Sequence, residues 1–190
     1  KELQYAWSKR DDITWTNNTD KYIGRASMNR FYIDGMKNVT KAGALWYHML
    51  TTPVIEVAGD GKTAKAVFMS FGNVSGAMAA GQPPAAQWTQ EKYGMDFIKE
   101  DGQWKIWHLR TYVDFYAGID KSWLDAKNNL AAPQEQQANG AGVKAEPGVS
   151  FEMAKPDVRG NFYEGYHLGR VPKFEPKPPV PYCTFSETEP

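Results

Sequence analysis

Apolar residues recur across residues 25–38 with the three- and four-residue spacing of one helical face. The positions in question are Met28, Phe31, Tyr32 and Met36. This spacing predicts a helix from Arg25 to about Asn38. Just before it, residues 12–16 alternate like a short strand, and the polar run 17–20 predicts a turn because Asn and Asp bond locally to the backbone. Residues 1–9 are typical of the end of a helix that begins before Lys1.

Four longer extended segments follow the predicted helix. They span residues 46–57, 63–71, 87–99 and 103–116. Gly59-Asp60-Gly61 predicts the turn between the first two, and Asp101-Gly102 predicts the last hairpin because both residues accept positive φ. Pro53 is expected at a sheet edge or bulge. A helix followed by hairpin-linked strands predicts an α+β fold with a mostly antiparallel sheet, closed by a short helix over residues 119–130.

The composition of the chain changes near residue 130. All 7 Trp lie between Trp7 and Trp123, whereas most of the 12 Pro follow Pro133. We therefore expect a compact domain over residues 1–130, a linker over 131–150 rich in small and polar residues, and an extended proline-rich arm over 151–190. The arm carries recurring aromatic rings, which are unusual in a solvated tail. We expect it to pack on its own domain or on a neighbouring subunit.

Charge and cysteine content exclude several classes of protein. The formal net charge is +0, which argues against nucleic acid as the main partner, because such proteins carry a Lys/Arg excess. No apolar run approaches the ~20 residues of a membrane helix. Cys183 is the single cysteine, so an intrachain disulfide is impossible and a reducing, cytoplasmic location is expected. The chain begins at Lys1 without Met, and we expect that residues precede it.

Two motifs on the predicted hairpins carry a family resemblance. His48 to Val57 follows the pattern H-x4-P-x-I-x-V, and Asp101 to Ile106 follows D-G-x-W-x-I. Over residues 1 to about 125 the chain resembles the SnoaL-like branch of the NTF2-like superfamily. The resemblance implies a curved sheet wrapped around helices as a cone with an apolar pocket. Its members include bile-acid and scytalone dehydratases, ketosteroid isomerase, polyketide cyclases and a diarylpropane deformylating lyase.

The chain departs from the bile-acid dehydratases at positions that matter for chemistry. Their catalytic Arg on the last strand corresponds to Asp114, and their carboxylate on the first hairpin corresponds to a position near Gly72. Their first helix, which contributes a Tyr and an Asp, is at most partly present here. A related pocket with a different polar set is therefore implied.

His48 is the foremost catalytic candidate, because it matches the dehydratase histidine and because histidine can exchange protons near neutral pH. A packed, inert histidine is the alternative. Arg110 and Asp114 are the other catalytic candidates. They share strand parity with His108 and Tyr112, and this face is either a pocket wall or an outer face at a subunit contact. Asp114 would act as a base or orient His48, and a bulge would change the parity.

Aromatic residues are expected to line the substrate pocket. The candidates for substrate binding are Tyr22, Tyr47, Phe68, Trp88, Tyr93 and Tyr112. The three His show no metal-binding spacing, and neither GxGxxG nor a P-loop occurs, so no metal or cofactor is expected.

These observations favour a cofactor-independent lyase. It would dehydrate or deformylate a hydrophobic, hydroxylated, ring-containing molecule, such as a lignin-derived aromatic dimer or a steroid, by proton abstraction. An isomerase of the same fold, or a ligand-binding or assembly module without chemistry, are the alternatives. The resemblance also implies a homodimer or homotrimer.

Overall fold

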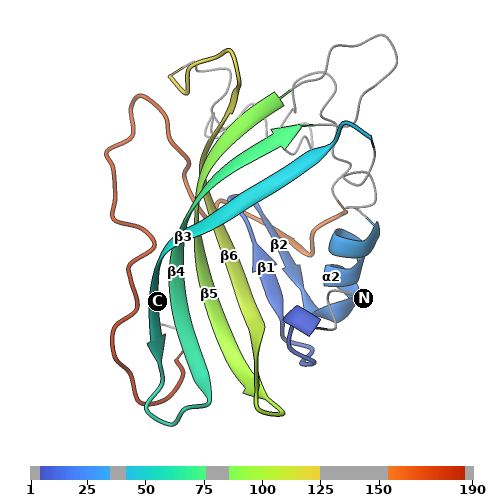
Figure 1. Cartoon of the computed structure of the whole chain (residues 1–190), viewed down its shortest axis with the longest axis vertical. Helices are drawn as coiled ribbons and strands as arrows, with labels where there is room; N and C mark the ends of the chain where they lie inside the picture. The colour runs from blue at the N-terminus through green and yellow to red at the C-terminus, as the bar shows by residue number, and fades with distance from the viewer. Residues whose placement is uncertain (1–4, 35–41, 76–85, 125–153, 187–190) are drawn as a thin grey trace.

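A single curved sheet organises the computed structural model, which describes residues 5–34, 42–75, 86–124 and 154–186 (Figure 1). Its seven strands lie in the order β3-β4-β5-β6-β1-β2-β7. Their bounds are β1 Thr14–Thr16, β2 Asp20–Ile23, β3 Leu45–Val57, β4 Thr63–Ser75, β5 Ala86–Glu100, β6 Gln103–Gly118 and β7 Val158–Arg159. Neighbouring strands are antiparallel except β1 and β6, which pair in parallel. The predicted α+β fold with a curved, mostly antiparallel sheet is confirmed.

The four long strands match the four predicted segments, and their turns form for the predicted reason. At the β5–β6 hairpin Asp101 and Gly102 have φ of 50° and 77°, and at the β3–β4 turn Gly61 has φ of 70°. Pro53 lies on the edge strand β3 at a register shift between Thr51 and Val54, as predicted. The alternating pattern and the turn residues are local signals, so they can be recognised in the sequence. In the sheet, the four strands that they predict are neighbours in sequence order.

The helical prediction is confirmed only in part. Helix α2 spans Gly24–Asn29 and continues as the π-helical turn η1, Arg30–Asp34. Residues 35–38 of the predicted helix lie outside the described residues. The prediction of a closing helix over residues 119–130 is wrong for residues 119–124, which form turns and bends. Residues 125–130 lie outside the described residues. Strands β2 and β7 were not expected, since each is too short to show a periodic pattern.

The hydrophobic core lies between one face of the sheet and α2. Trp15 stacks on Phe31 with ring centroids 4.2 Å apart and on Tyr22 at 5.2 Å. Met95 of β5 and Leu109 of β6 belong to the same buried cluster. We call this the inner face of the sheet, and the opposite one the outer face.

Two bulges in β6 decide which of its side chains reach the inner face. The β5–β6 register shifts between Asp96 and Phe97 and again between Gln90 and Glu91, so that Trp107 and Asp114 are extra residues in β6. Directly opposed residues of paired strands share a face. Consequently Leu109, Thr111 and Val113 lie on the inner face with Met95, and beyond the second bulge Tyr116 lies there too.

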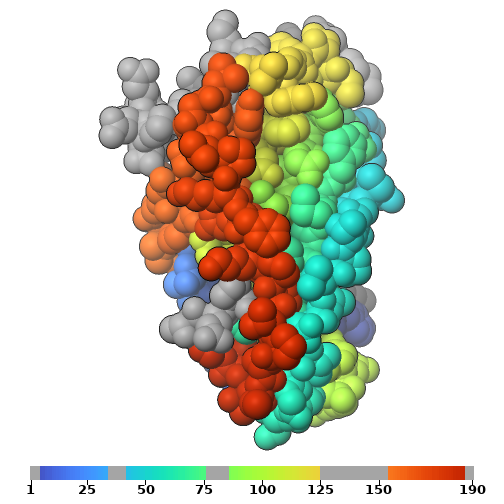
Figure 2. Space-filling model, turned by 90° about the vertical axis from the view of Figure 1, so that its left-hand side faces the viewer, coloured from blue at the N-terminus to red at the C-terminus, as the bar shows by residue number. Residues whose placement is uncertain are grey.

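Residues 154–186, the C-terminal segment, begin at the sheet edge, where β7 pairs with β2, and then run along the outer face (orange to red in Figures 1 and 2). The Tyr166 amide donates to the carbonyl of Asp114 at 2.7 Å, and the Gly59 amide donates to the carbonyl of Tyr182 at 2.9 Å. Lys65 of β4 donates to the carbonyl of Ser186 at 2.9 Å. The linker over residues 131–150 lies outside the described residues, so the division of the chain at 130 and 150 stays a prediction. Among the described residues, no helix is long and apolar enough to cross a membrane.

We expect Asn18→Ala to lower the free energy of unfolding by about 2–4 kcal/mol, because it removes two buried hydrogen bonds at once. The Asn18 side chain accepts from the Val113 amide at 2.9 Å and donates to the Val113 carbonyl at 2.8 Å. Both backbone groups would stay buried without partners. Urea unfolding measures the effect, with Thr19→Ala on the exposed neighbour as control. Equal midpoints for the two variants would contradict it.

Candidate functional site

The inner face carries a compact polar group on four adjacent strands. One cross-strand row consists of His48 on β3, Gly72 on β4, Thr89 on β5 and Tyr116 on β6. The next row places Ser70 directly opposite Glu91. Because each opposed pair shares a face, residues distant in the sequence meet around Glu91. These residues form what we call the inner-face site.

Glu91 is the centre of this site. Its side chain is 3% exposed, and its Oε1 accepts hydrogen bonds from Thr89 Oγ1 at 3.0 Å and from Tyr116 Oη at 3.2 Å. His48 Nδ1 lies 3.5 Å from the same oxygen, and the His48 side chain is 13% exposed. A buried carboxylate of this kind requires donors to replace its lost hydration. Thr89 and Tyr116 supply them, and they orient Glu91 towards His48.

Tyrosines around Glu91 are held in their protonated form. Burial raises the pKa of Tyr93, and the neighbouring Glu91 raises it further by its negative charge and by a hydrogen bond. The pKa of Tyr116 is raised well above its ordinary value for the same reasons, with burial again the largest. Both phenols are therefore proton donors throughout the physiological range.

We expect Tyr32→Phe to flatten the loss of stability at alkaline pH. Burial raises the pKa of Tyr32. The unfolded chain loses this proton near pH 10 while the folded chain keeps it, so below that pH the contribution of Tyr32 to stability is fully present and does not change with pH. Above it, stability falls by about 1.4 kcal/mol per pH unit for each such group. Urea unfolding at stepwise pH above 10 should show a shallower fall for the variant, and identical slopes would contradict this.

Gly72 makes the approach of His48 to Glu91 possible. A Cβ at position 72 would lie 2.8 Å from His48 Nδ1 and 2.6 Å from Thr89 Cγ2, closer than real Cβ contacts. Any other residue would therefore push the imidazole away from the sheet. Position 72 is also where the sequence resemblance located the dehydratase carboxylate. In this chain position 72 has no side chain, and the buried carboxylate of Glu91 lies one strand further along.

The structure does not bring the other two catalytic candidates to His48. Asp114 and Arg110 lie on the outer face, under the C-terminal segment. Asp114 accepts hydrogen bonds from Lys92 at 2.8 Å and Tyr163 at 2.6 Å, and Arg110 donates to the carbonyl of Phe162. The pairing of Asp114 with His48 suggested by the sequence is therefore not formed. The reason is the bulge at Trp107, after which His108, Arg110 and Tyr112 lie on the outer face, while Asp114 is itself the extra residue of the second bulge.

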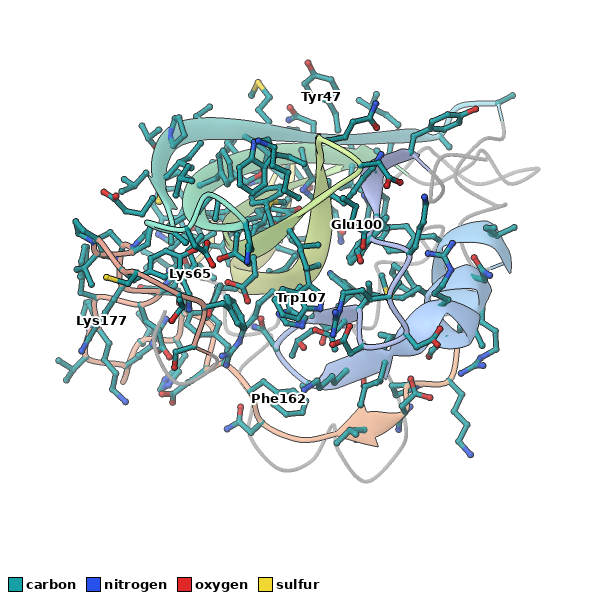
Figure 3. All side chains as sticks on the ribbon, turned by 90° about the horizontal axis from the view of Figure 1, so that it is seen from below. Tyr47, Lys65, Glu100, Trp107, Phe162 and Lys177 are labelled. Atoms are coloured by element: carbon teal, nitrogen blue, oxygen red, sulfur yellow. The ribbon has the colours of Figure 1, made fainter. Side chains whose placement is uncertain are left out.

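The six predicted substrate-binding aromatics are divided between the two faces. Phe68 and Tyr93 pack against the core on the inner face. Tyr22 is wholly buried in the core, and its hydroxyl donates to the Ala154 carbonyl at 2.6 Å. Tyr112 and Trp88 lie on the outer face, where Tyr112 meets Tyr163 and Trp88 meets Phe115. Tyr47 is 55% exposed at the rim of the molecule (Figure 3). Only Phe68 and Tyr93 are near Glu91.

Four residues of the inner-face site were not predicted from the sequence: Ser70, Thr89, Glu91 and Tyr116. One signal was present, because Thr89, Glu91 and Tyr93 share the parity of the apolar Met95 and Phe97 within one strand. A charged residue on the apolar side of a strand indicates a buried, partnered charge. Tyr116 gave no such signal, since the bulge at Asp114 hides its parity.

Chemically, the inner-face site combines an imidazole, a buried carboxylate and protonated hydroxyls. A base whose orientation is set by a third group is the general arrangement for proton abstraction. Among the described residues, no group of three or more His, Cys, Asp or Glu side chains is placed to hold a metal ion.

Comparison with known proteins identifies the family of the chain. Residues 2–110 match the model of the SnoaL-like domain, which is more than half of the chain. No curated protein matches. Among solved structures, a variant of the Rv3472 protein of Mycobacterium tuberculosis, of unknown function, is 28% identical, with a TM-score of 0.41; the match covers 55% of this chain and 55% of that one.

Two further solved structures are similar at lower identity. Hexachlorocyclohexane dehydrochlorinase LinA-type3 from Novosphingobium barchaimii LL02 is 16% identical over 63% of this chain and 76% of its own, with a TM-score of 0.46. An NTF2-like protein with a cystatin-like fold from Novosphingobium aromaticivorans is 18% identical over 64% of this chain and 70% of its own, with a TM-score of 0.40. Membership rests on the domain match, and the chain belongs to the SnoaL-like family.

Proposed function

We propose that this protein is a cofactor-independent lyase that removes a proton from a hydrophobic, hydroxylated, ring-containing molecule. The observation that carries the proposal is the His48–Glu91 pair at 3.5 Å on the inner face, with Glu91 held by Thr89 and Tyr116. Lignin-derived aromatic dimers and steroids are the proposed substrate classes. Phe68 and Tyr93 supply ring contacts beside the pair.

His48 acts as the base in the proposed reaction. Its Nδ1 faces Glu91, so a proton on Nδ1 points at the carboxylate and leaves Nε2 free to accept the substrate proton. The buried negative charge of Glu91 then stabilises the imidazolium that forms. Burial of the pair strengthens this interaction, because the surroundings screen it less than water would.

Two outcomes of proton abstraction are compatible with this geometry. In dehydration, the proton leaves a carbon, its electron pair forms a double bond to the adjacent carbon, and hydroxide departs there and is protonated to water. In deformylation, the proton leaves a primary hydroxyl and the carbon–carbon bond breaks to release formaldehyde. The freed electron pair forms the double bond while hydroxide departs from the next carbon.

Asp114 and Arg110 have no part in the proposed reaction. Both interact with the C-terminal segment on the outer face. Their proposed role is to hold this segment against β6, where Lys92 and Arg170 also contact Asp114.

Incubation of the purified chain with a panel of lignin-type diols and hydroxysteroids, without added cofactor, tests the proposal. We expect loss of 18 mass units for dehydration, or of a further 30 for deformylation, as follows from the atoms removed. An unchanged mass with altered chromatographic mobility would instead indicate an isomerase. Binding without any conversion across the panel would favour a ligand-binding module and contradict the lyase.

We also propose a homodimer or homotrimer. Strand β3 is an edge of the sheet and exposes Leu45, Tyr47, Met49 and Val54 by 39–55%. An exposed apolar edge strand is a site of association in natural proteins. Light scattering of the purified chain measures the mass directly, and a monomeric mass would contradict this.

A further inference from the structure

Ser70 carries a buried hydroxyl that has no role in the proposed reaction. It lies on β4, opposite Glu91 on one side and Leu50 on the other, and it is 0% exposed. Its Oγ has no hydrogen-bond partner within the described part of the chain. Within the same described part, His48 Nδ1 is likewise without a hydrogen bond, although Glu91 lies 3.5 Å away. Two unpaired polar atoms therefore adjoin one carboxylate.

Unpaired polar atoms of this kind are unusual. Nearly all buried hydroxyls in folded proteins have a partner, since a buried group without one costs free energy. A serine kept at an apolar, fully covered position of a strand offers no packing advantage over alanine. An unpaired buried hydroxyl beside a candidate catalytic pair points to a partner that arrives with the substrate.

The charge around Glu91 restricts what that partner is. The inner-face residues in the rows of Thr89, Glu91 and Tyr93 include no Lys or Arg within the described strands. An anionic group placed there would face the Glu91 carboxylate without a compensating cation, in surroundings that screen charge poorly. A hydroxyl group both donates and accepts, so it can accept from Ser70 while donating towards Glu91.

We propose that Ser70 is a specificity-determining residue that hydrogen-bonds the hydroxyl oxygen of an uncharged ring compound bound beside His48. This rests on the proposed function for the location of the substrate, but not on turnover. Phe68 lies two residues before Ser70 on the same face and provides the apolar contact for the ring. The inner-face site thereby discriminates between a ring with a hydroxyl, one with a carboxylate and one with neither.

Three bicyclic probes of similar size test this: 2-naphthol, 2-methylnaphthalene and 2-naphthoate. Their affinities for wild type, Ser70→Ala and Ser75→Ala are measured by calorimetry. Ser75 is the control because it lies on the same strand with its hydroxyl bound to the Gly43 carbonyl at 2.9 Å. The wild type should bind 2-naphthol most tightly and 2-naphthoate least.

In Ser70→Ala the affinity for 2-naphthol should fall about 5- to 10-fold, the ordinary worth of one hydrogen bond. The affinity for 2-methylnaphthalene should stay unchanged, and thermal stability should be equal or higher because no unpaired hydroxyl remains. An unchanged affinity for 2-naphthol, an equal loss for both neutral probes, or no binding of 2-naphthol to the wild type would overturn the proposal. Selective binding without turnover would leave it standing while refuting the lyase.

Discussion

Turnover is expected to fall about 10²- to 10⁴-fold in His48→Ala, the range over which a positioned general base contributes. In the proposed reaction the imidazole is the group that accepts the substrate proton. His108→Ala is the matched control, since His108 pairs with Asp96 at 2.9 Å on the outer face. Steady-state kinetics on whichever panel compound is converted, with circular dichroism to verify folding, measures both variants.

The Glu91→Gln variant separates the effect of the negative charge of Glu91 from the effect of the size and shape of its side chain. The amide keeps the size of the side chain but removes the charge that stabilises the imidazolium, so kcat should fall while KM changes little. Glu56→Gln is the control, because Glu56 lies on β3 opposite Lys65 on the outer face. Full activity of His48→Ala, or a larger loss in the controls than in the site variants, would contradict the role of this pair.

Gly72→Ala is expected to reduce turnover by about 100-fold, because displacing a catalytic group by about 1 Å costs this much. The added Cβ would lie 2.8 Å from His48 Nδ1 and would push the imidazole away from Glu91. Stability should also fall, since the same Cβ meets Thr89 Cγ2 at 2.6 Å. Gly59→Ala is the control, because its nearest contact would be an ordinary 3.5 Å.

The double variant Gly72→Ala with Thr89→Ser divides these two effects. Serine lacks the methyl group that clashes but keeps the hydroxyl that donates to Glu91. Stability should therefore recover in part, while turnover stays low because the His48 contact remains. Recovery of turnover together with stability would show that Gly72 matters only for packing. Chemical unfolding and steady-state kinetics on the same preparations decide between the two.

The hairpins could be predicted from the sequence because their signals are local. Asp101-Gly102 accepts positive φ because of its own two residues, and alternating side chains favour a strand in a sheet that buries one face. The family resemblance rests on motifs within residues 48–106 that are equally local, and this explains why it led to the correct family. His48 became a catalytic candidate in this way, and the structure places it beside a buried carboxylate, while its catalytic role stays a prediction.

The sequence by itself thus determined the α+β fold, the order of the long strands and the position of His48. Only the tertiary structure decided which carboxylate His48 meets. Two bulges in β6 reverse the parity of that strand, so Asp114 faces Lys92 and Tyr163 while Tyr116 faces Glu91. Where a bulge falls depends on how two strands pair across the sheet, and this pairing is a long-range property that no local pattern carries.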